Sequence, residues 1–244
     1  MPTIEIKNLS YSYKGEKGMN VLALDNLNAL FCNGKISAIL GSSGSGKTTL
    51  LRLLAGLDFN YKGNILFSTE EMKGVPPKDR NLSYVSQNFS MYPHMTLFDS
   101  IAYPLKLAGA EKEEIKQRVY DVSRQLDIFA LLSRKPKQVS LGELQRACIA
   151  RAIVKRPEIA LFDEPLANLD EVNRNHARHL LKNVLRTFDS TVIYVTHSLK
   201  EATSLADTIY VIEEGKIKYS CTPKEASKLL NSELKPYFES EKYD

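Results

Sequence analysis

An octapeptide near residue 45 has the pattern of a phosphate-binding loop. Residues 41–48, GSSGSGKT, match Gly-x-x-x-x-Gly-Lys-Ser/Thr between a predicted strand and a predicted helix. Glycines let backbone N–H groups turn around phosphates, Lys47 would reach the β- and γ-phosphates of a nucleotide, and Thr48 would ligate Mg²⁺. A glycine-rich turn with a chance lysine is the alternative, which the strand–helix context disfavours. The predicted nucleotide contacts here are Gly41, Ser42, Ser43, Gly44, Ser45, Gly46, Lys47, Thr48 and Thr49.

Two further strand ends carry polar side chains that suit the same chemistry. Asp163 and Glu164 follow the apolar stretch 158–162, and His197 follows the stretch 191–196. Ligands of α/β folds bind at the carboxyl ends of strands. Asp163 would hold Mg²⁺ through water, and Glu164 would orient or deprotonate an attacking water. A solvated acidic pair and a surface histidine are the alternatives; His197 is a candidate γ-phosphate contact.

The elements that must position these residues alternate along the chain. Short apolar stretches alternate with helical patterns, which favours an α/β fold with a largely parallel sheet. Ile115, Val119, Val122 and Leu126 fall at helical spacing, so the middle of the chain is predicted to be helical. The predicted elements are strands over 35–40, 81–85, 158–162 and 191–195, a helix over 48–55, helices within 97–156, a hairpin over 209–219 and a charged helical tail.

Composition excludes several classes of protein. The 244 residues are 43% hydrophobic, enough for a sizeable core, and the net charge of +4 is spread along the chain, so a nucleic-acid partner is not expected. The three cysteines have no metal or disulfide spacing, which fits a reducing cytosol. His176 and His179 are three residues apart on a predicted helix, but no third metal ligand lies nearby at a suitable spacing, so a metal site is not expected there. No apolar run approaches the roughly 18–20 residues of a membrane span, so another chain would cross any membrane involved.

Together these motifs resemble, over nearly the whole chain, the ATP-binding subunit of an ABC transporter. Gln87 resembles that family's Q-loop glutamine, residues 139–146 (VSLGELQR) its signature motif, and residues 167–170 its D-loop. His197 resembles the switch histidine. Tyr13 is the residue that the resemblance places on adenine, with Tyr11 as the less favoured choice. The motifs follow one another in the family's order and spacing.

The resemblance implies a fold and a site. The expected fold is an α/β P-loop NTPase (RecA-like) core with a mainly parallel sheet, an N-terminal antiparallel β subdomain and a helical subdomain insert. A single ABC ATPase domain would span 1–244, with the ATP-binding core in 1–87 and 157–244 and the helical subdomain in 88–156. ATP and Mg²⁺ are the implied cofactors. The implied roles are catalysis by Glu164, His197 and Gln87, and metal binding by Thr48, Gln87 and Asp163. Ser140, Gly142 and Glu143 of this chain would contact the nucleotide bound by a partner subunit.

The resemblance also implies partners. Transmembrane permease subunits would dock near Asn88–Leu105, a second ATPase subunit would close over the nucleotide, and a substrate-binding protein would act indirectly. The chain would then be peripheral, at the cytoplasmic face of the cell membrane. Residues 76–80 and 92–96 are similar to the carbohydrate-importer branch, which suggests import of a sugar or polyol. A soluble ABC ATPase of DNA repair or translation, and a non-hydrolysing regulatory subunit, are the alternatives.

The chain departs from that branch in three places. It stops at Asp244, without the branch's C-terminal regulatory domain, so regulation through that domain is expected to be absent or to lie elsewhere. Ser198 stands where Asp commonly follows the switch histidine. In the signature, Leu141 replaces Gly and Glu143 replaces Gln.

The altered signature leaves two arrangements open. Ser140 and Glu143 match a capping box at a helix start, worth about 1 kcal/mol, so the cap is expected to persist. Leu141 adds bulk beside the nucleotide. An ionised Glu143 roughly 8 Å from a phosphate charge would cost roughly 2 kcal/mol at an effective dielectric of about 20. A homodimer with two weakened sites and a heterodimer with one normal site both fit, and the second is preferred.

Overall fold

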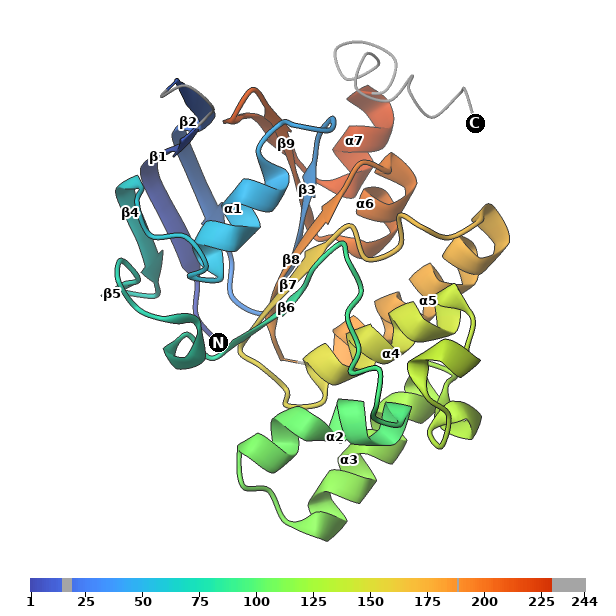
Figure 1. Cartoon of the computed structure of the whole chain (residues 1–244). Coiled ribbons are helices and arrows are strands. Elements are labelled where there is room, and N and C mark those ends of the chain that lie inside the picture. Colours follow the sequence, from blue (N-terminus) through green and yellow to red (C-terminus); the bar gives the residue numbers. More distant parts are fainter. Residues whose placement is uncertain (15–18, 188, 230–244) are drawn as a thin grey trace.

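The strands form two sheets, and helices flank the larger one (Figure 1). The computed structural model describes residues 1–14, 19–187 and 189–229. The six-stranded sheet has the order β10-β9-β3-β8-β7-β6 and is parallel except for the β9–β10 pair. Its strands are β3 (Ile36–Leu40), β6 (Leu82–Val85), β7 (Ile159–Asp163), β8 (Thr191–Thr196), β9 (Thr208–Glu213) and β10 (Lys216–Cys221).

The central strands are buried because both faces of the sheet are covered. Every residue of β3, β7 and β8 is buried, as is typical of parallel sheets between layers of helices. One face carries Ile39, Leu161 and Val195 and packs on α1 (Lys47–Leu54). The alternate residues, such as Leu40 and Phe162, pack on the other side with residues of α5 (Glu171–Thr187) and α6 (Leu199–Leu205).

The second sheet is antiparallel and comes mainly from the start of the chain. It has the order β2-β1-β4-β5, and its core residues join α1 and one face of the larger sheet in a single cluster. Its strands are β1 (Ile4–Lys14), β2 (Asn20–Phe31), β4 (Lys62–Phe67) and β5 (Glu70–Glu71). A 3₁₀ turn, η2 (Pro77–Asp79), leads from this region into β6.

The segment between β6 and β7 is helical, as its periodicity predicts. It contains α2 (Leu97–Leu107), α3 (Lys112–Gln125) and α4 (Leu141–Ile153), with 3₁₀ turns η3 (Phe129–Leu131) and η4 (Pro136–Gln138). These helices lie together below the larger sheet in Figure 1. Apolar residues at helical spacing, Ile115, Val119 and Val122, are buried in the core that α2, α3 and α4 share.

The predicted α/β fold, with its mainly parallel sheet and antiparallel N-terminal sheet, is confirmed. The four predicted strands are present within a residue or two of their expected bounds, and 209–219 forms the β9–β10 hairpin. Part of the predicted charged tail forms α7 (Pro223–Leu229), and the rest lies outside the described residues. Across the described part of the chain, no helix combines the length and apolar character needed to cross a membrane.

Candidate functional site

The loop after β3 leaves the start of α1 open to a ligand. Gly46 is the N-cap of α1, with φ 106°, and among the described residues no side chain caps the helix. A Cβ on Gly46 would lie 2.7 Å from the Ala23 carbonyl oxygen, so both the conformation and the packing require glycine. The first N–H groups of a helix have no acceptor within it, and they carry the positive end of the helix dipole. This helix start can therefore bind an anion.

Lys47 lies folded into the loop. Its Nζ donates hydrogen bonds of 2.8 Å to the carbonyl oxygens of Gly41 and Ser42, and it lies 3.7 Å from Oε1 of Glu164. Burial lowers the pKa of Lys47, and the carboxylates of Glu164 and Asp163 oppose that shift. The ammonium group is thus held among oxygen atoms at the mouth of the loop, from where it can turn toward a phosphate.

Each carboxylate oxygen of Asp163 accepts a hydrogen bond from a hydroxyl group. Thr48 Oγ1 donates to Oδ1 at 3.1 Å, and the Tyr84 phenol donates to Oδ2 at 3.1 Å. Burial raises the pKa of Asp163, and these hydrogen bonds oppose the shift. Tyr84 was not among the predicted site residues. Its contact with Asp163 follows from the pairing of β6 with β7, so no local sequence pattern indicates it.

Glu164 and His197 form a pair at the ends of neighbouring strands. Glu164 follows β7 with φ 47°, a conformation uncommon for a residue with a side chain, and its N–H donates to the carbonyl of Val195. His197 Nδ1 lies 3.1 Å from Glu164 Oε2. The hydrogen bond between them lowers the pKa of Glu164 and raises the pKa of His197. The carboxylate is therefore held ionised beside Lys47.

Lys47, Glu164 and His197 line one cavity of about 680 Å³ together with Thr48. Asp163 is buried next to this cavity, where it accepts the hydrogen bond of Thr48. Gln87, two residues after β6, and Tyr13 of β1 also line the cavity, and the Tyr13 hydroxyl lies 3.0 Å from Thr49 Oγ1. Tyr11 packs edge-on against Tyr13, with ring centroids 4.9 Å apart, and does not line the cavity. The lining residues are Tyr13, Val21, Leu22, Ala23, Ser42, Ser43, Gly44, Gly46, Lys47, Thr48, Thr49, Gln87, Glu164 and His197.

Some predicted contacts do not line this cavity. Gly41 contributes its carbonyl oxygen to Lys47, and Ser45 is buried behind the loop. Ser140, Gly142 and Glu143 lie at the start of α4 and are absent from the lining. The structure therefore brings together the residues of one half of the predicted site and leaves the signature residues apart from them.

The predicted capping box at the signature is present. Ser140 is the N-cap of α4: its Oγ accepts from the N–H of Glu143 at 3.3 Å, and its own N–H donates to Glu143 Oε2 at 2.7 Å. The hydrogen bond from the Ser140 N–H lowers the pKa of Glu143, and the nearby charges of Arg146 and Arg134 act in the same direction. Leu141 is 49% exposed, so its added bulk projects outward from the helix start.

The donor set fits a magnesium nucleotide. Magnesium is usually held by one or two carboxylates together with phosphate oxygens and water. Thr48 and Gln87 offer hard oxygen atoms in the lining of this cavity, and the carboxylate of Asp163 is hydrogen-bonded to Thr48. Among the described residues, no group of three or more His, Cys, Asp or Glu side chains could hold a metal by itself. Of His176 and His179, the two histidines three residues apart, the first has its Nε2 atom 3.5 Å from Oδ2 of Asp127.

Several similar proteins are named as import ATP-binding proteins. The chain is 39% identical to the sn-glycerol-3-phosphate import ATP-binding protein UgpC of Chromobacterium violaceum over 225 residues, 92% of this chain and 60% of that protein. It is 39% identical to the spermidine/putrescine import ATP-binding protein PotA of Marinobacter nauticus over 222 residues, 91% of this chain and 58% of that protein. The chain thus spans about three fifths of the length of these relatives.

The fold has close matches among solved structures. The dimeric structure of MJ0796, a bacterial ABC transporter cassette, matches with a TM-score of 0.81 and 27% identity, covering 90% of this chain and 98% of that one. A post-hydrolysis state of the same cassette, bound to ADP and Pi, matches with a TM-score of 0.80 and 26% identity over the same shares.

The family model described as ABC transporter matches residues 24–167, which is more than half of the chain. This range includes the loop, the signature and both acidic residues at the end of β7, Asp163 and Glu164. By the family match and by the identity to its relatives, the chain belongs to the ABC transporter family.

Proposed function

We propose that this chain is the ATP-binding and ATP-hydrolysing subunit that energises an ABC transporter, with ATP and Mg²⁺ as cofactors. The observation that carries the proposal is the convergence of three groups on one cavity: Lys47 in the loop, Thr48 hydrogen-bonded to Asp163, and Glu164 paired with His197. Its likeness to a cassette bound to ADP and Pi supports the same site.

The chain's own residues divide the work as follows. The loop N–H groups and Lys47 bind the phosphates, with Tyr13 against the base. Thr48, Gln87 and Asp163 hold Mg²⁺, which neutralises charge on the phosphates when it is bound. Glu164 orients the attacking water or accepts its proton, and His197 keeps its carboxylate in place through the 3.1 Å contact.

A second ATPase subunit completes the site. Its signature would face the nucleotide, and this chain's Ser140, Gly142 and Glu143 would do the same for the partner. The MJ0796 cassette forms a dimer, which supports this arrangement. The capping box and the charges of Arg146 and Arg134 make the altered signature less unfavourable than its sequence suggests. The exposed side chain of Leu141 is compatible both with a homodimer and with a heterodimer.

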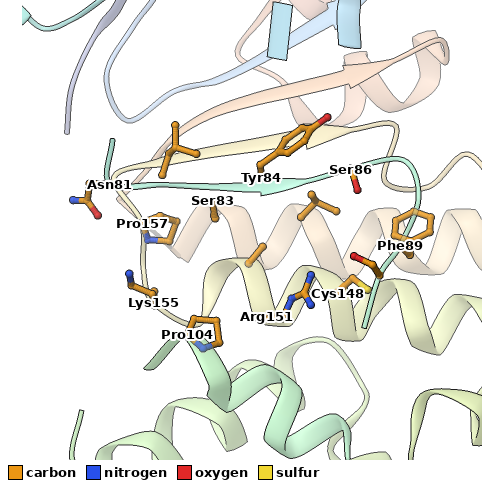
Figure 2. Close-up of a pocket in the computed structure, with 14 residues that line it drawn as sticks. Asn81, Ser83, Tyr84, Ser86, Phe89, Pro104, Cys148, Arg151, Lys155 and Pro157 are labelled. Carbon is orange, nitrogen blue, oxygen red and sulfur yellow. The ribbon is translucent and has the colours of Figure 1, made fainter. Parts of the chain in front are cut away.

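A groove between the edge strand β6 and helices α2 and α4 is the proposed dock for a permease subunit (Figure 2). Its volume is about 320 Å³. Phe89, Ser90 and Pro104, which line it, belong to the stretch 88–105 predicted to contact the permease. Arg151 and Lys155 of the α4 side also line it and favour a docking segment with acidic residues. The proposed helical subdomain, 88–156, and the core formed by 1–87 and 157–244 would meet at this groove.

The proposed task is import of a small solute, such as a sugar or polyol, from a position at the cytoplasmic face of the cell membrane. The relatives named for sn-glycerol 3-phosphate import support a polyol-type solute. Relatives named for import of spermidine/putrescine and of molybdate/tungstate have comparable identities. A substrate-binding protein would deliver the solute to the permease. The import names disfavour a role in DNA repair or translation.

ATP turnover by the purified chain tests the proposal. Glu164→Gln should lower turnover by about 10²-fold or more while ATP still binds, because the group that orients the water is lost. Lys47→Ala should instead weaken ATP binding, measured by fluorescence of a labelled nucleotide. Wild-type turnover in the Glu164 variant together with unchanged affinity in the Lys47 variant would refute the proposed site. Glu158→Gln, a change to an exposed acid before β7, is a matched control.

A further inference from the structure

We propose that Tyr84 is a positioning residue for the metal-binding carboxylate of Asp163, and that its phenol sets the affinity of the site for the divalent cation. This inference rests on the proposed function and deepens it. Tyr84 lies outside the loop and outside every motif described above. Within the described part of the chain, its phenol hydrogen-bonds Asp163 and no residue of the phosphate loop.

The sheet register explains why this tyrosine reaches that aspartate. Strands β6 and β7 are parallel, and Tyr84 lies opposite Leu161. Asp163 is two residues beyond Leu161, so it points to the same face of the sheet, and a long aromatic side chain reaches such a diagonal neighbour. Figure 2 shows Tyr84 leaving β6 on the side opposite to Ser83, Arg151 and Pro104. Its ring packs into the core on the α1 side.

The two hydroxyl groups that donate hydrogen bonds to Asp163 have different roles in the proposed site. Asp163 is 1% exposed, so water contributes little to fixing its carboxylate. Thr48 occupies Oδ1, but its hydroxyl oxygen is also a proposed metal ligand. Tyr84 occupies Oδ2 from the neighbouring strand and anchors that oxygen whichever way the Thr48 hydroxyl turns. Hydrogen-bond partners that orient a metal ligand typically change metal affinity by about 10-fold to 100-fold.

The variant Tyr84→Phe removes the hydroxyl and keeps the ring, so core packing is retained. Tyr61→Phe is the matched control. Tyr61 is 3% exposed and lies in the same core cluster, and its hydroxyl has no hydrogen-bond partner among the described residues. A loss caused by general disturbance of this core would appear in both variants, whereas a loss through Asp163 would appear only in the Tyr84 variant.

The test is a titration of the full chain with Mn²⁺, followed by electron paramagnetic resonance, in the presence of adenylyl-imidodiphosphate. We expect the half-saturating Mn²⁺ concentration of Tyr84→Phe to rise by about 10-fold or more, with Tyr61→Phe unchanged. Binding of the same nucleotide in EDTA should be equal within about twofold for all three proteins, because the phosphate loop is untouched. The Mg²⁺ dependence of turnover should shift in parallel, while turnover at saturating Mg²⁺ changes little.

Two results would overturn the inference: a Tyr84→Phe titration that superimposes on the wild type, and an equal weakening in both tyrosine variants. Melting temperatures of all three proteins show that each is folded. A wild-type chain that binds neither the nucleotide nor Mn²⁺ with it would overturn the proposed function as well. The failure of the Tyr84 inference alone is therefore distinguishable, since the wild type would still bind both.

Discussion

Replacing Arg80 by methionine should destabilise the protein markedly, because this buried cation connects the end of α1 to the turn formed by residues 72–75. Arg80 is 3% exposed. Its Nη1 donates to the carbonyl oxygens of Leu53 and Leu54 at the end of α1, each at 2.8 Å. Its Nη2 donates to Met72 at 2.7 Å and its Nε to Val75 at 2.9 Å. A cation at a helix C-terminus is also favoured by the helix dipole.

The size of the expected destabilisation depends on which carbonyl oxygens still accept a hydrogen bond after Arg80 is replaced. The carbonyl of Leu53 still accepts from the N–H of Gly56, and the carbonyl of Met72 from the N–H of Val75. The carbonyls of Leu54 and Val75 would lose the donor that Arg80 supplies. Each unsatisfied buried acceptor costs about 1–3 kcal/mol, and relief from burying the guanidinium offsets part of the sum. We expect a net loss of about 2–4 kcal/mol in the free energy of unfolding.

Urea denaturation and thermal melting measure this loss. For a chain of this size, each kcal/mol lowers the melting temperature by about 2–4 °C, so Arg80→Met should melt roughly 5–15 °C lower. Arg52→Met is the control on the same helix. Arg52 is 40% exposed and pairs with Asp58, and surface pairs contribute about 1 kcal/mol or less. Melting of the Arg80 variant within about 2 °C of the wild type would refute the reasoning.

Two other predictions concern the signature and the paired strand ends. Restoring glycine at Leu141 and glutamine at Glu143 should raise ATP-dependent dimerisation, measured by light scattering in the hydrolysis-deficient Glu164→Gln background; no gain would mean that the native signature is already competent. Because the pKa of His197 is raised and that of Glu164 is lowered, their pair stabilises the fold while both are charged, above the ordinary pKa of Glu164, 4.5, and below that of His197, 6.5. The melting-temperature difference between wild type and His197→Ala should therefore be larger at about pH 5.5 than at about pH 9.5, where the histidine has lost its proton. Equal differences at both pH values would contradict that assignment.

Local patterns predicted the parts of this molecule that depend on neighbouring residues. The loop before α1, the buried strands and the capping box of Ser140 and Glu143 each follow from spacing along a few residues, and each is present. The contacts of Tyr84 and Arg80 were not predicted. Tyr84 meets Asp163 only because β6 pairs with β7 in one register. Arg80 meets α1 only after two segments distant in sequence have packed together. Such contacts depend on tertiary arrangement, which periodicity does not encode.

The four-residue strand β6 lies between the proposed nucleotide site and the proposed docking groove. On one side, Tyr84 holds a carboxylate of the proposed nucleotide site; on the other, Ser83 and the strand's backbone line the groove proposed for the permease. Any occupant of the groove that displaces this strand displaces the phenol with it. Thermodynamic linkage then requires the converse: whatever fixes Asp163 alters affinity in the groove by the same factor. Because the edge strand β6 borders both proposed sites, a displacement of this strand would couple binding at one site to binding at the other.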